Sequence, residues 1–185
     1  MGSRIVIVGM MGVGKTTVGR QLAVLVKCSF DDLDDKVSDQ DQGHRTVADI
    51  IRQDGEISFR SDEMTAFRSW LESKEHQGGI LSAGGGLVTQ TEARMLLANS
   101  NILVIWLTAS IPILIQRLGE TPESKRPLLD GRSSYEDRLE ELMSIRCHLY
   151  ESVADVVVET GNLSPDTIVQ KIWEQISKDH EPCLV

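Results

Sequence analysis

The chain has 185 residues, a length that suits one domain with a core large enough to fold unaided. Its formal net charge is −9, which argues against general nucleic-acid binding, because that function needs a basic face. No apolar stretch is long enough to span a membrane, so we expect no membrane partner.

The N-terminus lacks the layout of a signal peptide, and three cysteines lie far apart, at Cys28, Cys147 and Cys183. This spacing indicates neither a disulfide framework nor a metal site, and it suits a reducing compartment. We therefore expect a cytoplasmic protein. The alternative is a plastid chain whose transit peptide has been removed.

Apolar runs alternate with helical periodicity along the chain, a pattern typical of a parallel sheet covered by helices on both faces. Residues 120–134 interrupt it with two prolines, a glycine and several charges, which predicts a mobile surface segment. We expect strands at 4–8, near 29–30, and at 80–83, 102–107 and 153–158. We expect helices at 15–26, 34–41, 47–53, 56–73, 89–98, from a cap at Ser110 to about 119, at 135–151, and from 164 onward.

The strongest motif is G-M-M-G-V-G-K-T, from Gly9 to Thr16, which follows an apolar strand and opens a helix. It matches the phosphate-binding pattern G-x-x-x-x-G-K-[ST] in the required context. Glycines let backbone N–H groups turn toward phosphate oxygens, and the helix N-terminus adds its positive dipole end. The alternative, a glycine-rich turn with an accidental lysine, is disfavoured by both flanks. We expect phosphate contacts from Gly12, Val13, Gly14, Lys15, Thr16 and Thr17.

An acidic cluster, F-D-D-L-D-D, follows the second strand. Asp32 and Asp34 are two residues apart, so in an extended segment their side chains point the same way. One could hold Mg²⁺ through water while the other orients or deprotonates an acceptor hydroxyl. The alternative is a solvated acidic loop before a helix. We expect Asp31 and Asp35 to lie on the surface.

Further candidates lie near the carboxyl ends of strands or on nearby helices. Gly84, Gly85 and Gly86 follow the third strand and would let a backbone N–H approach a ligand, although they could form only a turn. Arg60 could pair with a carboxylate or make a surface ion pair.

Two more arginines leave alternatives open. Arg126, in the segment 120–134, could neutralise charge on a transferred phosphoryl group, or it could be an ordinary loop arginine. Arg146 lies four residues before Tyr150 on a charged helix, where the alternative is a surface residue without function.

Together these motifs resemble those of the shikimate kinase family. The family order is matched by G-M-M-G-V-G-K-T, D-L-D, G-E-I-S-F-R, S-A-G-G-G, R-P-L-L and R-C-H-L-Y, over essentially residues 4–176. The resemblance implies a P-loop kinase of the nucleoside-monophosphate-kinase type. Its fold would be an α/β three-layer sandwich, with a five-stranded parallel sheet in the order 2-3-1-4-5, helices on both faces and a mobile lid.

The resemblance also implies an activity and an organisation. The activity is ATP- and Mg²⁺-dependent phosphorylation of the 3-hydroxyl of shikimate, a step of chorismate and aromatic amino-acid synthesis. One kinase domain would span residues 1–185, with a lid at about 119–134 and an acceptor-binding helical region at about 34–62. The partners would be ATP and shikimate, and the chain would be a monomer.

Residue roles follow from the same resemblance. Lys15 matches the phosphate-binding lysine, and Thr16 matches the magnesium ligand. Asp32 matches the aspartate that is linked to magnesium through water. Asp34 matches the aspartate that holds the reacting substrate hydroxyl. Lys15 and Asp34 are therefore expected to be catalytic.

The other matches concern the acceptor and the lid. Arg60 and Arg146 match arginines that grip the substrate carboxylate, with Gly84, Gly85 and Gly86 alongside. Arg126 matches the lid arginine near the transferred phosphate, so it is expected to be catalytic and to contact the nucleotide. Arg117 matches a residue that packs on adenine.

Competing functions make different demands on the sequence. A gluconate-type or other small-metabolite kinase would keep the phosphate loop but lack the Arg60 and Arg146 pair. A nucleoside monophosphate kinase must read a base, and aromatic residues make up only 4% of this chain. A GTPase switch would need N-K-x-D and D-x-x-G, and neither string occurs. A non-catalytic nucleotide-binding relative would keep the fold without the reaction.

Overall fold

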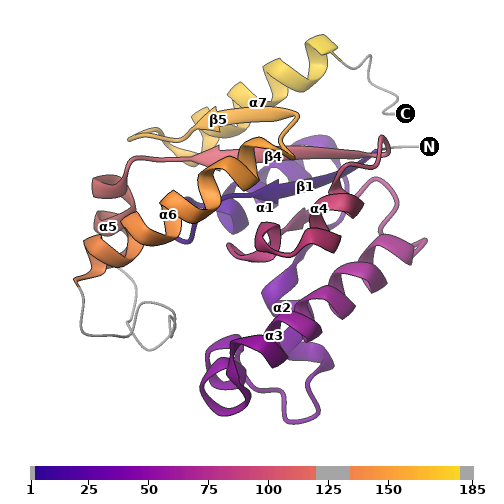
Figure 1. The fold of residues 1–185 in the computed structure, drawn as a ribbon. Helices are drawn as coiled ribbons and strands as arrows, with labels where there is room; N and C mark the ends of the chain where they lie inside the picture. The colour runs from indigo at the N-terminus through magenta and orange to yellow at the C-terminus, as the bar shows by residue number, and fades with distance from the viewer. Residues whose placement is uncertain (1–2, 120–133, 180–185) are drawn as a thin grey trace.

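In the computed structural model, which describes residues 3–119 and 134–179, a five-stranded parallel sheet forms the centre of the molecule (Figure 1). The strand order is β2-β3-β1-β4-β5, as predicted. The inner strands are rich in Val, Ile and Leu because both of their faces are buried. The strands are β1 (Arg4–Val8), β2 (Phe30–Asp32), β3 (Ile80–Ser82), β4 (Ile102–Thr108) and β5 (Val156–Glu159).

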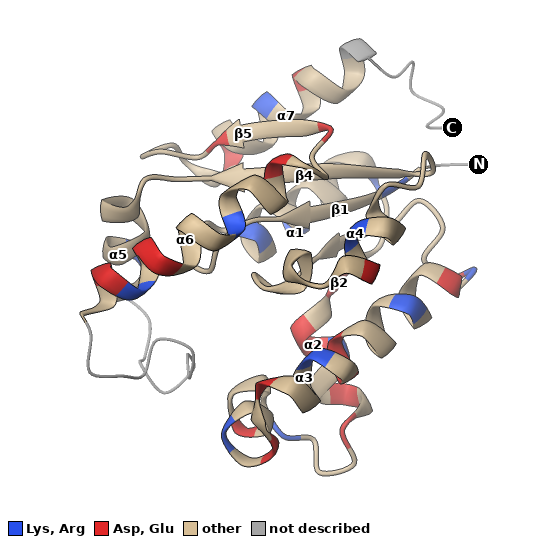
Figure 2. Ribbon diagram, viewed as in Figure 1, with Lys and Arg blue, Asp and Glu red and all other residues tan. Residues whose placement is uncertain are grey.

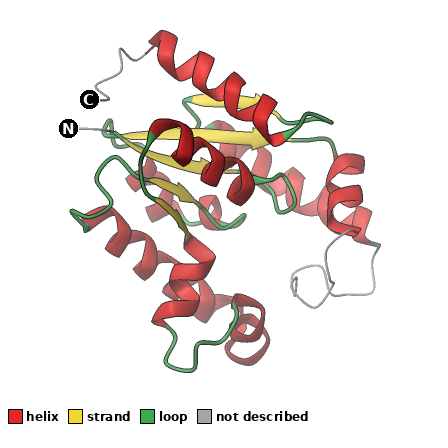
Figure 3. Cartoon of the chain, turned by 180° about the vertical axis from the view of Figure 1, so that it is seen from behind, coloured by secondary structure: helices red, strands yellow, loops and turns green. Residues whose placement is uncertain are grey.

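Helices cover both faces of this sheet, which gives the predicted three layers (Figures 1 and 3). Helices α1 and α7 pack together on one face, and α4 and α6 lie on the other. No helix among the described residues combines the length and the apolar character needed to cross a membrane. The helices are α1 (Lys15–Val26), α2 (Leu33–Gln40), α3 (Val47–Glu72), α4 (Thr91–Leu97), α5 (Ile111–Gly119), α6 (Tyr135–Glu151) and α7 (Pro165–Asp179), with a 3-10 turn η1 (Leu87–Thr89).

The break expected between the helices 47–53 and 56–73 occurs inside α3, where Gly55 is non-helical with a φ of 86°. The starts of two other elements differ from the sequence prediction by two residues or more. The strand expected at 153–158 begins only at Val156, because the chain first leaves α6 through a turn. The helix expected at 89–98 begins at Thr91, after η1.

Helices α2 and α3 pack against each other and project from the β2 edge of the sheet (Figure 1). The prediction that Asp31 lies on the surface is wrong. Its half-buried carboxylate accepts a hydrogen bond from Trp70 Nε1 at 2.9 Å and pairs with Lys36 Nζ at 2.7 Å. Burial opposes the charge, but these partners together hold the pKa of Asp31 below its usual value. Asp31 therefore ties α3 to β2.

The burial of one face of α3 in the hydrophobic core yields a stability prediction. Phe67 is fully buried on α3, so Phe67→Ala should lower the free energy of unfolding by about 3–5 kcal/mol through the cavity that it leaves. Met95 on α4 is 73% exposed, so Met95→Ala should change it by no more than about 0.5 kcal/mol. Urea denaturation measures both variants, and equal effects would contradict this packing.

Candidate active site

A cavity of about 310 Å³ opens at the carboxyl edge of the sheet. Open α/β sheets bind ligands at this edge. The cavity is lined by the phosphate loop, the acidic end of β2, one face of α3, the glycine turn after β3 and one arginine of α6. The fold therefore brings together motifs that are widely separated in the sequence.

The phosphate loop has the conformation that its glycines predict. Gly12 and Gly14 have φ values of 78° and 100°, which side-chain-bearing residues rarely adopt. No side chain caps α1, so its first N–H groups remain available to an anion. Lys15 Nζ donates to the carbonyl oxygens of Gly9 and Met10 at 2.9 and 3.0 Å, which holds the ammonium group over the loop.

An oxygen-rich cluster adjoins the start of α1. Thr16 Oγ1 donates to Asp32 Oδ2 at 2.7 Å and lies 3.5 Å from Ser82 Oγ. Hydroxyl and carboxylate oxygens suit Mg²⁺, which usually keeps several waters and binds substrate phosphates. Thr16 and Asp32 therefore supply oxygen atoms of the kind that Mg²⁺ accepts, and a nucleotide would add phosphate oxygens. In the described part of the chain, no group of three or more His, Cys, Asp or Glu residues could hold a metal ion.

The segment that carries Asp32 and Asp34 is bent, so the expectation of an extended segment is wrong. Asp32 ends β2 and caps α2, where its Oδ1 accepts from the backbone N–H of Asp34 at 3.1 Å. Both side chains still line the cavity, because the bend turns the first residues of α2 toward the phosphate loop. Asp35 is exposed, as predicted.

Asp34 occupies an electrostatically unusual position. The residue is exposed to solvent in the cavity, but protein atoms surround its carboxyl group on the other sides. This burial, followed by the charges of Asp32 and Glu63, raises the pKa of Asp34 to about 7, against the opposing effects of Lys15 and Arg60. A carboxylate with a pKa near neutrality is suited to accept a proton from a hydroxyl group.

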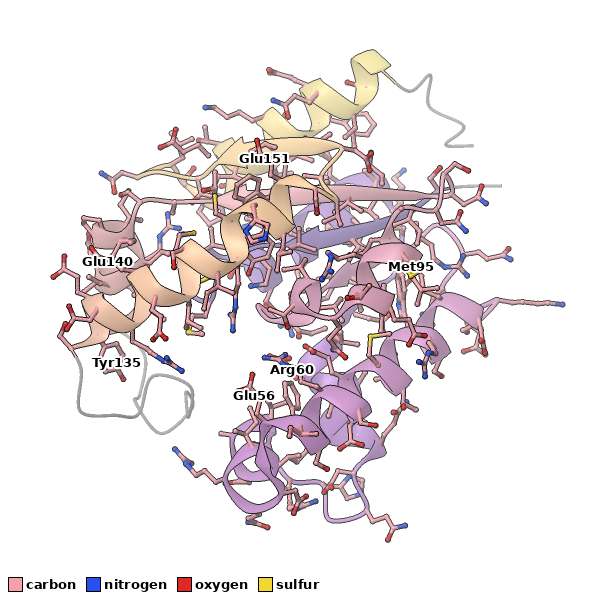
Figure 4. The ribbon with its side chains drawn as sticks, viewed as in Figure 1. Glu56, Arg60, Met95, Tyr135, Glu140 and Glu151 are labelled. Atoms are coloured by element: carbon pink, nitrogen blue, oxygen red, sulfur yellow. The ribbon has the colours of Figure 1, made fainter. Side chains whose placement is uncertain are left out.

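Arg60 reaches the cavity from α3, one helical turn beyond the bend at Gly55. Its Nη1 donates to Glu63 Oε2 at 2.7 Å, and its Nη2 donates to Glu56 Oε1 at 2.9 Å. Figure 4 shows Arg60 and Glu56 pointing from α3 toward the side on which α6 lies. A Cβ on Gly86 would lie 2.1 Å from Arg60 Nη2, so only glycine leaves room for this guanidinium.

Glu63 was missed by the sequence analysis. It has no exposed surface, and burial raises its pKa although Arg60 pairs with it. Its position three residues after Arg60 on a helix is a spacing at which side chains meet, and that spacing could have identified it.

Arg146 is buried, with 4% exposure, so the surface alternative is wrong. Its Nη1 donates to the carbonyl oxygen of Gly85 at 3.1 Å, while its buried Nε has no hydrogen-bond partner. Burial lowers its pKa from the ordinary arginine value. Tyr150, which the sequence analysis did not assign to the site, donates its hydroxyl to the same carbonyl and stacks on Trp106.

Arg117 lies beside the phosphate loop at the end of α5. Its Nη1 donates to the Val13 carbonyl at 3.1 Å and to Thr160 Oγ1 at 3.0 Å, and its Nη2 donates to the Gly161 carbonyl at 2.6 Å. Arg117 therefore connects α5, the phosphate loop and the turn after β5. Arg126 and most of the predicted lid lie outside the described residues.

The negative net charge does not conflict with an anion site. Figure 2 shows acidic residues on α2 and along the first turns of α6. In the described cavity, Lys15, Arg60 and Arg146 supply the cations. Affinity for an anion depends on the field and donors at the site more than on the total charge.

Fold and site together define a P-loop kinase of the nucleoside-monophosphate-kinase type. The phosphate loop and the Thr16–Asp32 pair can bind a nucleotide with Mg²⁺, and the other half of the cavity combines two arginines with Asp34. A family model described as shikimate kinase matches residues 11–177. The chain belongs to the shikimate kinase family.

Individual relatives agree with this assignment. The shikimate kinase of Streptomyces avermitilis is 36% identical over 173 residues, which cover 94% of this chain and 95% of that protein. The solved shikimate kinase of Acinetobacter baumannii, in complex with shikimate, is 32% identical with a TM-score of 0.87 and covers 97% of this chain and 95% of its own. A gluconokinase from Sinorhizobium meliloti has a TM-score of 0.63 at 19% identity, covers 97% and 94%, and shares the fold alone.

The electrostatics of the cavity can be tested directly. In the ligand-free protein, the Asp34 carboxyl should titrate at about pH 7, and Glu63→Gln should lower this pKa by removing a nearby negative charge. Carboxyl ¹³C NMR follows the titration. Glu56→Gln is the matched control on α3 and should shift it less. A titration of Asp34 near pH 4 in the unmodified protein would show that its surroundings do not disfavour the charged carboxylate.

Proposed function

We propose that this protein transfers the γ-phosphoryl group of ATP to the 3-hydroxyl of shikimate, with Mg²⁺, giving shikimate 3-phosphate and ADP. The reaction is a step of chorismate and aromatic amino-acid synthesis. The observation that carries the proposal is one cavity that holds Lys15 and Thr16 on one side and Asp34, Arg60 and Arg146 on the other. Shikimate has the matching chemistry, a carboxylate together with hydroxyl groups.

The nucleotide half of the site binds phosphates. Backbone N–H groups of Gly12, Val13 and Gly14, with Thr17 at the start of α1, surround the phosphate oxygens. Lys15 exchanges its carbonyl partners for the terminal phosphates. Thr16 and Asp32 would hold Mg²⁺, since their oxygen atoms lie together beside the phosphate loop. When bound, Mg²⁺ neutralises negative charge on the phosphates.

The acceptor half orients shikimate. Arg60 and Arg146 bind its carboxylate, and Gly84, Gly85 and Gly86 line the same cavity alongside them. Asp34 accepts the hydrogen bond, and then the proton, of the reacting hydroxyl. Most of the rate enhancement comes from this alignment and from charge neutralisation at the phosphoryl group.

The remaining assignments complete the proposal. Arg126 contributes charge beside the transferred phosphoryl group, and Arg117 contacts the adenine. Residues 1–185 form one monomeric kinase unit, with a lid at about 119–134 and an acceptor-binding region at about 34–62. Because the reaction consumes ATP and the cysteines suit a reducing environment, we place the protein in the cytoplasm.

The first experiment measures ADP release from ATP and Mg²⁺ with shikimate, quinate, gluconate or nucleoside monophosphates as acceptor. Shikimate should stimulate release strongly. Lys15→Ala should reduce kcat by at least about a hundredfold, because charge stabilisation in the transition state is lost. Stimulation by gluconate alone would support the rival metabolite kinase, and nucleotide binding without any turnover would support a non-catalytic relative.

The close approach of Gly86 to Arg60 gives a second test. Gly86→Ala should displace the guanidinium and raise the KM for shikimate about tenfold, with the KM for ATP nearly unchanged, because one charged hydrogen bond is disturbed. In an Arg60→Ala background the same change should have little further effect. Equal losses in both backgrounds would show that Gly86 acts through something other than Arg60.

A further inference from the structure

Glu63 has a contact outside the cavity that none of the proposed roles explains. Gln90 lies between η1 and α4, beyond the cavity lining, and its Nε2 donates to Glu63 Oε2 at 3.0 Å. This is the same oxygen that accepts from Arg60 Nη1 at 2.7 Å. One buried carboxylate oxygen therefore joins the arginine to the segment that follows the glycine turn.

The position of Gln90 in its own element does not account for this contact. Gln90 is the N-cap residue of α4, but its side chain makes no capping hydrogen bond. An ionised carboxylate can only accept hydrogen bonds, so the amide presents its NH₂ group to Glu63. The Gln90 side chain therefore links the start of α4 to α3.

The energetics of Glu63 make this donor important. Burial raises the pKa of Glu63, while Arg60 and then the Gln90 amide favour the charged form. A buried carboxylate that lacks its partners is costly to keep ionised. Only the charged form offers Arg60 an anionic partner at that oxygen. The ionisable groups that face Glu63 are Arg60 on α3, Asp34 on α2, and Arg146 and Tyr150 on α6.

We infer that Gln90 is a positioning residue for the acceptor site, which keeps Glu63 in place so that Glu63 fixes Arg60 against the glycine turn. Gln90 acts through Glu63 and does not contact the substrate. The inference rests on the proposed function, since it assigns Arg60 to the shikimate carboxylate. An arginine that is fixed before binding loses less conformational freedom when the ligand arrives, which increases affinity.

The decisive experiment compares Gln90→Leu with the unmodified protein in steady-state kinetics. The KM for shikimate should rise about tenfold, the consequence of losing one hydrogen bond to a charged group, while the KM for ATP changes less than about twofold. The rise should become larger as the pH is lowered, because Glu63 without its donor takes up a proton more readily. Equal rises in both KM values, or none, would overturn the inference.

A matched control separates this role from simple cross-linking of α3 and α4. Glu92 on α4 also reaches α3, where it pairs with the exposed Arg68, five residues after Glu63 in the sequence. Glu92→Gln should leave both KM values within about twofold of the unmodified protein. A rise like that of Gln90→Leu would show that any α3–α4 contact has this effect, and it would overturn the inference.

A second readout does not depend on the substrate. Burial raises the pKa of Glu63 in the folded state, and Gln90→Leu should raise it further. The pKa difference between the folded and unfolded states is therefore larger in the variant than in the unmodified protein. The variant should therefore lose Tm relative to the unmodified protein at about pH 8, and this loss should shrink as the pH falls to about 4. A loss of Tm that is independent of pH would contradict the electrostatic role of Gln90. If the unmodified protein does not phosphorylate shikimate, the proposed function fails, and this measurement still decides whether Gln90 supports the charge of Glu63.

Discussion

Parallel pairing of β1 with β3 on one side and β4 on the other is the constraint on which the site depends. In this register Ile7 lies opposite Ser82 and Val8 lies opposite Trp106, so the phosphate loop and the glycine turn leave the sheet at the same edge. Lys15 and Gly85 are 70 residues apart in the numbering, yet they line one cavity. Parallel strands make this possible because all of their carboxyl ends face the same way.

At that edge of the sheet, each cationic side chain of the site is paired with a second group. Lys15 is held by loop carbonyls, Arg60 by two glutamates and Arg146 by the carbonyl of Gly85. Cations held in this way are oriented before a ligand arrives, which reduces the entropic cost of binding. Asp34 is the exception, since neighbouring carboxylates oppose its charge, and this opposition suits it to proton transfer.

Local patterns predicted much of this architecture. The strand 4–8 and the helices 15–26 and 135–151 occur as predicted, because their apolar periodicity and their capping or glycine signals agree. The acidic segment was harder to predict. Its spacing favoured an extended pair of aspartates, whereas capping by Asp32 begins a helix there. The role of Asp31 was also misjudged, because its partners Trp70 and Lys36 lie on other elements.

The sequence by itself determined the phosphate loop, the family, the strand order that the family implies and the residue types of the site. Those features depend on local backbone conformation or on short sequence motifs, and both can be recognised from the sequence alone. Only the tertiary structure decided that Arg146 is buried, that Glu63 holds Arg60 and that Gln90 reaches Glu63. Each of these facts depends on which side chains meet across elements and on how much water is excluded between them, and packing decides both.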